Sequence, residues 1–178
     1  SSLEMAAGGV VHVTLEYRLG VLGFLALDDG ETVPNVGLLD QLSALRWVQR
    51  HIRSFGGDPG RVLVYGHSAG AVSVMALQRM PAAKGLFHAA AAMSPLPGHG
   101  AVHAEAAALW REAVRSTGCA DRACLLGLSA RTLASLPLPV SGDFGTIPDP
   151  LSPAVPSLQF VVADRSLDEK WAVHEGFA

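Results

Sequence analysis

The stretch RVLVYGHSAGAVSVMAL, residues 61–77, decides the fold. Its first five residues form a mostly apolar run that predicts a strand, and its last seven predict a helix. Between them, residues 66–70 read G-H-S-A-G and match the pattern G-x-S-x-G. In this order the motif predicts a strained turn, where only small flanking residues avoid a collision. Such a turn lifts the Ser68 hydroxyl clear of the sheet and aims the Ala69 N–H at the place where an oxyanion would form.

The motif alone is a weak signal, because the chain has 19 glycines. The alternative is a glycine-rich turn between a strand and a helix, in which Ser68 serves only as an N-cap residue. The surrounding sequence therefore has to decide between the two interpretations.

Composition narrows the function classes. The chain has 178 residues, 49% of them hydrophobic and 16% charged, so it can bury a core and has the length of one domain or part of a larger one. Its net charge of −3 and the lack of a basic tract disfavour nucleic-acid binding. No uncharged apolar run is long enough to span a bilayer, and the first residues do not resemble a signal peptide. Cys119 and Cys124 lack metal-ligand spacing, so we expect neither a metal nor a cofactor.

Hydrophobic patterns predict alternating strands and helices over the first half of the chain. Strands are expected over residues 9–17, 62–65 and 86–93, and a long loop over 20–34. A helix is expected over residues 38–55, where apolar side chains recur every three or four positions: Leu38, Leu42, Leu45, Val48, Ile52 and Phe55. This alternation indicates an α/β fold with a mostly parallel sheet and flanking helices.

The second half is predicted to be helical at first and irregular later. We expect a helix over residues 101–117 that is closed by Gly118, and short helices over 124–128 and 130–136, the second capped by Ser129. Six of the eleven prolines fall within residues 137–156. The predicted organisation is therefore a domain over residues 1–136 and a proline-rich continuation or tail over residues 137–178.

Five blocks together resemble the type-B carboxylesterases, which include the cholinesterases and the neuroligin-like adhesion proteins. They are residues 11–25, similar to "NYRLGxxGFL" and its strand; 35–41, similar to "NxGLxDQ"; 44–59, similar to "ALxWVxxNIxxFGGDP"; 64–70, similar to "xFGESAG"; and 84–88, similar to "xGLFHRAI". They stand in the family's order over residues 1–94. The resemblance implies a partial α/β-hydrolase fold in which Ser68 is the nucleophile of the elbow and the Ala69 N–H an oxyanion donor.

By this resemblance, the complete protein hydrolyses small-molecule carboxylic esters through an acyl-serine intermediate. The family's glycine-rich oxyanion loop and its catalytic histidine are expected outside residues 1–178, so the isolated chain should have little or no activity. Two departures from the family pattern are Glu16, where Asn is usual, and His67, where Glu is usual. His67 cannot be the base for its own neighbour, since adjacent side chains at an elbow point apart, and a scaffold role is expected for it.

The catalytic acid and base are less well marked. His174-Glu175-Gly176-Phe177 weakly resembles the family block that carries the acid, which makes Glu175 a candidate against the alternative of an exposed tail residue. His88 is expected to be structural. The stretch from Gly118 to Leu125 resembles a contracted family disulfide loop, and the Cys119–Cys124 bond could be formed or absent.

Two other interpretations stay open. The scaffold also carries non-catalytic adhesion proteins, although those often lose the serine, and an incomplete product that never folds stably is a third possibility. The two cysteines slightly favour a secreted or ER-lumenal protein over a cytoplasmic one, if they pair. The substrate and the oligomeric state are left open.

Overall fold

The computed structural model describes residues 2–95, 103–136 and 158–164. These residues fall into two compact units. Unit 1 contains the described residues 2–16, 41–95 and 158–164, and unit 2 contains residues 17–40 and 103–136.

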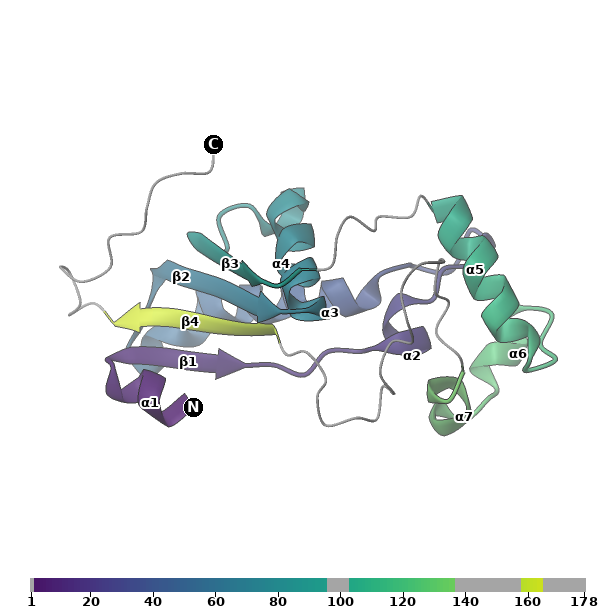
Figure 1. The fold of residues 1–178 in the computed structure, drawn as a ribbon, viewed down its shortest axis with the longest axis horizontal. Helices are drawn as coiled ribbons and strands as arrows, with labels where there is room; N and C mark the ends of the chain where they lie inside the picture. Colours follow the sequence, from purple (N-terminus) through teal and green to yellow (C-terminus); the bar gives the residue numbers. More distant parts are fainter. Residues whose placement is uncertain (1, 96–102, 137–157, 165–178) are drawn as a thin grey trace. The chain divides into compact units, whose positions relative to one another are not determined.

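Unit 1 is built around a four-stranded sheet with the order β1-β4-β2-β3 (Figure 1). Strands β1 (Val10–Thr14), β2 (Gly57–His67) and β3 (Ala89–Met93) run in one direction, with β2 and β3 paired in parallel. Strand β4 (Leu158–Asp164) lies between β1 and β2 and runs antiparallel to both. The three expected strands are thus present and run in the same direction, while β4 makes two of the three pairings antiparallel. Strand β1 ends three residues earlier than the predicted range.

Helix α3 (Val36–His51) and the 3-10 turn η1 (Ile52–Phe55) replace the single helix expected over residues 38–55. Leu42, Leu45, Val48 and Ile52 are at most 3% exposed, as the apolar periodicity predicts. Phe55 is the exception, because a 3-10 turn has three residues per turn and shifts its face away from that of α3. It is 60% exposed, and its ring centroid lies 5.7 Å from that of Trp47, with the two ring planes tilted by 45°.

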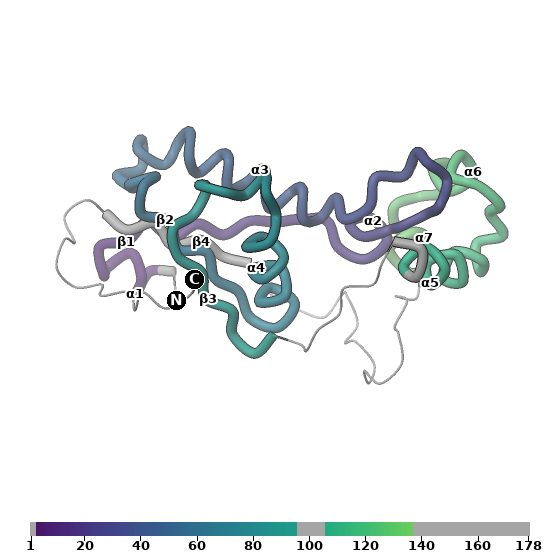
Figure 2. The backbone as a smooth tube through the Cα atoms, turned by 90° about the horizontal axis from the view of Figure 1, so that it is seen from above, coloured from purple at the N-terminus to yellow at the C-terminus, as the bar shows by residue number. Residues whose placement is uncertain are grey.

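Helix α4 (Ala69–Arg79) packs against β2 and β3 and continues into the 3-10 turn η2 (Pro81–Ala83). Its inward residues Ala71, Val74 and Leu77 recur at helical spacing and are at most 1% exposed. Figure 2 shows the course of α3 and α4, which are joined by a hydrogen bond from Gln41 Nε2 to Ser73 Oγ at 3.1 Å. A short N-terminal helix, α1 (Ser2–Ala7), lies against β1.

Unit 2 contains helices α2 (Gly20–Phe24), α5 (His103–Arg115), α6 (Arg122–Leu126) and α7 (Ala130–Ala134). Its core joins Val21 and Ala26 to Trp110 and Ala113. Ser129 caps α7 by accepting a hydrogen bond from the Thr132 N–H, as the sequence predicts.

Two expectations were wrong. The segment expected as a loop over residues 20–34 contains α2, because Val21 buries itself in the core of unit 2 and Gly23 packs against the Arg18 carbonyl with no room for a side chain. The loop or extended segment expected over residues 137–156 lies outside the described residues, whereas the tail after it, expected to have little clear pattern, contributes β4 to the sheet of unit 1.

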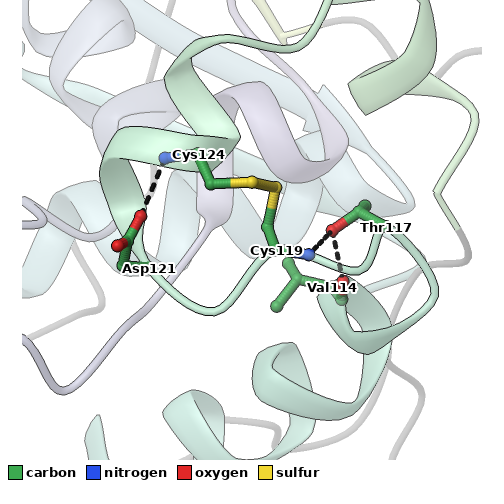
Figure 3. The surroundings of a disulfide bond; sticks show 5 residues. All are labelled: Val114, Thr117, Cys119, Asp121 and Cys124. Carbon is green, nitrogen blue, oxygen red and sulfur yellow. Dashed lines mark hydrogen bonds between the residues drawn. A yellow bond between two sulfur atoms is a disulfide. The ribbon is translucent and has the colours of Figure 1, made fainter.

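The open question about the cysteines is answered in the structure. Cys119 and Cys124 form a disulfide with their Cα atoms 5.4 Å apart (Figure 3). Asp121 caps α6 inside this loop, since its Oδ1 accepts a hydrogen bond from the Cys124 N–H at 2.8 Å. Thr117 Oγ1 accepts from the Cys119 N–H at 3.1 Å. The short loop is therefore fixed at both ends by side-chain oxygens.

One ion pair in unit 2 should make stability depend on pH. Arg18 Nη2 and Nε donate to the two Asp40 oxygens at 2.6 and 2.8 Å, and these hydrogen bonds hold the pKa of Asp40 below its usual range. A depressed pKa stabilises the folded state above the value of about 3.9 for an unfolded aspartate, and this stabilisation is lost as pH falls through the folded pKa.

We therefore predict that Asp40→Asn reduces the fall in melting temperature between about pH 5 and pH 2.5, measured by circular dichroism. Arg18→Gln should reduce it by a similar amount, and the double variant should add nothing further, because both single changes remove the same pair. An acid limb in Asp40→Asn as steep as that of the wild type would contradict the prediction.

Candidate active site

The site is the turn between β2 and α4. Strand β2 ends at His67, helix α4 begins at Ala69, and Ser68 joins them with φ 55° and ψ −118°. A positive φ is uncommon for a residue with a side chain, so surrounding contacts must hold it there. The turn is held on its strand side by the Ser68 N–H, which donates to the Met93 carbonyl at 3.0 Å, and on its helix side by the Val72 N–H, which donates to the Ser68 carbonyl at 3.1 Å.

The glycines explain why this sequence can make the turn. A Cβ placed on Gly66 would overlap the carbonyl carbon and oxygen of Gly70. The end of β2 and the start of α4 therefore approach each other more closely than any side chain at position 66 would permit. Both glycines are buried, whereas Ser68 between them is partly exposed.

The Ser68 hydroxyl is not used to cap the helix. Ser68 occupies the N-cap position of α4, but its side chain makes no capping hydrogen bond. It has no other hydrogen-bond partner within the described part of the chain. The N-cap interpretation requires that bond, so the geometry favours a serine whose hydroxyl is presented to a ligand.

The Ala69 N–H stands at the first position of α4, and Ala69 is exposed. The first N–H groups of a helix have no acceptor within the helix, and the helix dipole adds partial positive charge at this end. A negative charge that develops on a substrate oxygen next to Ser68 would be stabilised there. The oxyanion role of the Ala69 N–H stays a prediction.

The described histidines have other surroundings. His88 is structural as expected. Its ring Nδ1 accepts a hydrogen bond from the Val62 N–H at 3.3 Å, and its backbone N–H donates to the Val62 carbonyl at 2.8 Å. His12 Nε2 lies 2.8 Å from the Tyr65 hydroxyl, and burial raises the pKa of Tyr65. His67 is exposed and lies on the strand face of Leu63 and Tyr65, opposite that of Val62 and Val64, and the scaffold role expected for it stays a prediction.

The candidate acid falls outside what the structure describes. Glu175 lies outside the described residues, as do His99 and His174, and of His103 only the backbone is described. Within the described residues, no hydrogen bond joins the Ser68 side chain to an acid or a base. In the described ranges, no three His, Cys, Asp or Glu side chains cluster as metal ligands would, and no helix is both long and apolar enough to cross a membrane.

An apolar pocket lies elsewhere in unit 1. Its volume is about 410 Å³, and its lining does not include Ser68. The lining residues come from α1 and the sheet: Glu4, Met5, Gly8, Val10, Leu63, Tyr65, Ala91 and Met93. Met93, whose carbonyl accepts the hydrogen bond from the Ser68 N–H, is thus the lining residue that adjoins the turn.

Sequence reasoning gave no role to the buried pair Gln41 and Ser73, which ties α3 to α4 one turn after the elbow. A signal was present, because Gln41 stands four residues before Leu45 and therefore on the apolar face of α3. A polar residue in that register needs a buried partner.

Comparison with known proteins agrees with the geometry. The sequence profile described as "Carboxylesterase family" matches residues 2–150. The cocaine esterase of Oryctolagus cuniculus is 54% identical over 81 residues, which cover 46% of this chain and 15% of that enzyme. The para-nitrobenzyl esterase of Bacillus subtilis is 55% identical over 87 residues, which cover 48% of this chain and 18% of that enzyme. The chain thus matches less than a fifth of the length of these relatives.

Solved structures show the same relationship. The carboxylesterase of Geobacillus stearothermophilus superposes with a TM-score of 0.64 at 37% identity, over 75% of this chain and 30% of that one. A PNB esterase superposes with a TM-score of 0.59 at 40% identity, over 67% of this chain and 26% of that one. The chain belongs to the carboxylesterase family and carries part of its α/β-hydrolase fold.

Proposed function

We propose that Ser68 is the nucleophile of a carboxylic ester hydrolase in the protein that carries this chain. One observation carries the proposal: Ser68 is held at a positive φ between a strand and a helix, with a hydroxyl that no described residue binds. A serine held only for structure would use that hydroxyl in a cap or a turn. The same observation disfavours the adhesion interpretation, which has no need of a presented serine.

The proposed reaction is acyl transfer. The Ser68 Oγ attacks the ester carbonyl carbon, and the charge that develops on the carbonyl oxygen is stabilised by the Ala69 N–H at the start of α4. A general base takes the proton of the Ser68 hydroxyl and delivers it to the leaving alkoxide, so the alcohol departs as the acyl-serine forms. Water, deprotonated by the same base, then attacks the acyl-serine, and the proton returns to Ser68 as the acid is released. The base and the second oxyanion donor stay unassigned, and Glu175 remains a predicted candidate for the acid.

Substrate and setting follow from the same proposal. The substrate class is small-molecule carboxylic esters, in keeping with the names of the matched cocaine and para-nitrobenzyl esterases. The Cys119–Cys124 disulfide supports an oxidising compartment, secreted or ER-lumenal. The boundary at residue 136 between domain and tail stays a prediction.

The proposal predicts that an organophosphate adds one covalent adduct to Ser68 of the full-length protein, detected by mass spectrometry of the peptides. Ser68→Ala should abolish the adduct, because no other described serine stands at an elbow. Ser43→Ala is the matched control, since Ser43 is exposed on α3, and it should leave labelling unchanged. An unlabelled protein that still unfolds cooperatively would refute the proposal.

The isolated chain of 178 residues is predicted to turn over p-nitrophenyl acetate slowly. Loss of one oxyanion donor alone lowers turnover by about 10²–10³-fold, and the described residues also bring no base to Ser68. Comparison of the initial rates of the purified chain and its Ser68→Ala variant checks this. Rapid turnover that disappears in Ser68→Ala would show that the chain supplies its own base.

A further inference from the structure

We infer that Gln41 is a positioning residue for the elbow: its buried amide fixes the first turns of α4, and with them the directions of the Ala69 N–H and the Ser68 hydroxyl. The inference rests on the proposed function and adds to it a residue on α3 that has no contact with the ester. It predicts that removal of the amide lowers the reactivity of Ser68 while the melting temperature stays the same or rises.

The side chain of Gln41 is an unusual choice for its place. Gln41 is fully buried at 0% exposure, on the apolar face of α3 with Leu45. Gln41 and Ser73 are the two buried polar residues in the described part of the chain. Gln41 Nε2 donates to Ser73 Oγ at 3.1 Å, and Gln41 Oε1 has no hydrogen-bond partner there.

A half-satisfied amide is a poor choice for stability alone. Burial removes the oxygen of Gln41 from water, and no donor in the described residues compensates it. A linear apolar side chain of the same length would fill the space without that penalty. The amide at this position therefore calls for a contribution other than stability.

The contribution of the Gln41 amide is to fix the orientation of α4. Ser73 lies five residues after Ser68 and four after Ala69, so it stands one turn above the N–H that is proposed to meet the oxyanion. Apolar burial resists the separation of packed elements but is not directional, whereas a hydrogen bond loses strength when its angle changes. The Gln41–Ser73 bond therefore restrains rotation of α4 about its own axis.

The strand side of the turn already has such a restraint. The Ser68 N–H is bound to the Met93 carbonyl on β3. With the Gln41–Ser73 bond, each side of the turn is fixed by a directional bond to a neighbouring element. Removal of the helix-side bond should leave the fold intact and loosen the geometry at Ser68.

The test compares two glutamines of the same helix. Gln41→Met keeps length and volume but removes the amide, and Gln49→Met is the matched control, because Gln49 Nε2 donates to the carbonyls of Pro59 and Leu86, away from the elbow. The melting temperature and the second-order rate constant of organophosphate labelling are measured for the full-length protein. Gln41→Met should melt at the same or a higher temperature and be labelled about 10–100-fold more slowly, since small misplacements of reacting groups lower rates this much.

The controls separate positioning from simple structural support. Gln49→Met should lower the melting temperature and keep the labelling rate of the folded protein. Ser73→Ala should slow labelling as Gln41→Met does, and the double variant should be no slower than either. Wild-type labelling rates in Gln41→Met, or equal losses of stability and rate in both glutamine variants, would overturn the inference.

A second measurement does not depend on reactivity. Amide hydrogen exchange of Val72, whose N–H is bound to the Ser68 carbonyl, should become about tenfold faster in Gln41→Met and stay unchanged in Gln49→Met. Unchanged exchange of Val72 would overturn the inference. If the wild type is not labelled at all, the proposed function fails, and the exchange result still decides whether Gln41 holds the turn.

Discussion

The close approach of Gly66 to Gly70 is the constraint on which the rest of the site depends. The two backbones meet with no space for even one side-chain carbon at position 66. This approach forces the chain to reverse between β2 and α4 within the single residue Ser68, which takes a positive φ as a result. The hydroxyl is then presented at the tip of the turn, next to the unbonded first N–H of α4.

The strain at Ser68 is sustained by packing on both sides of it. Leu42, Leu45 and Val48 of α3, together with Val74 and Leu77 of α4, are almost fully buried, so both helices contribute closely packed side chains to the core. Closely packed elements transmit small displacements rather than absorb them. The buried Gln41 amide, whose oxygen has no partner in the described residues, is then useful because its hydrogen bond to Ser73 fixes the orientation of α4 at the elbow.

The elbow and the helix before it could be predicted because their signals are local. G-x-S-x-G between an apolar run and a helix specifies its own turn, and the apolar period of α3 specifies its buried face. The strand β4 could not be placed, because it pairs with β1 about 150 residues away and with β2 about 100 residues away. A short apolar run in the sequence does not indicate which strands it pairs with. The Gln41–Ser73 bond was missed for the same reason, since its members are 32 residues apart. Phe55 was misassigned because the helix changes its period at Ile52.

The central claim is that residues 10–95 of this chain form a working nucleophile elbow. The most direct test is a chimera. In the para-nitrobenzyl esterase of Bacillus subtilis, the matching segment is replaced by residues 10–95 of this chain, and the rest of that enzyme is kept. The chimera is assayed for hydrolysis of para-nitrobenzyl acetate, and its folding is checked by thermal unfolding. The account predicts hydrolysis that is lost in the Ser68→Ala chimera. A chimera that unfolds cooperatively, as the parent enzyme does, yet hydrolyses no ester would contradict it.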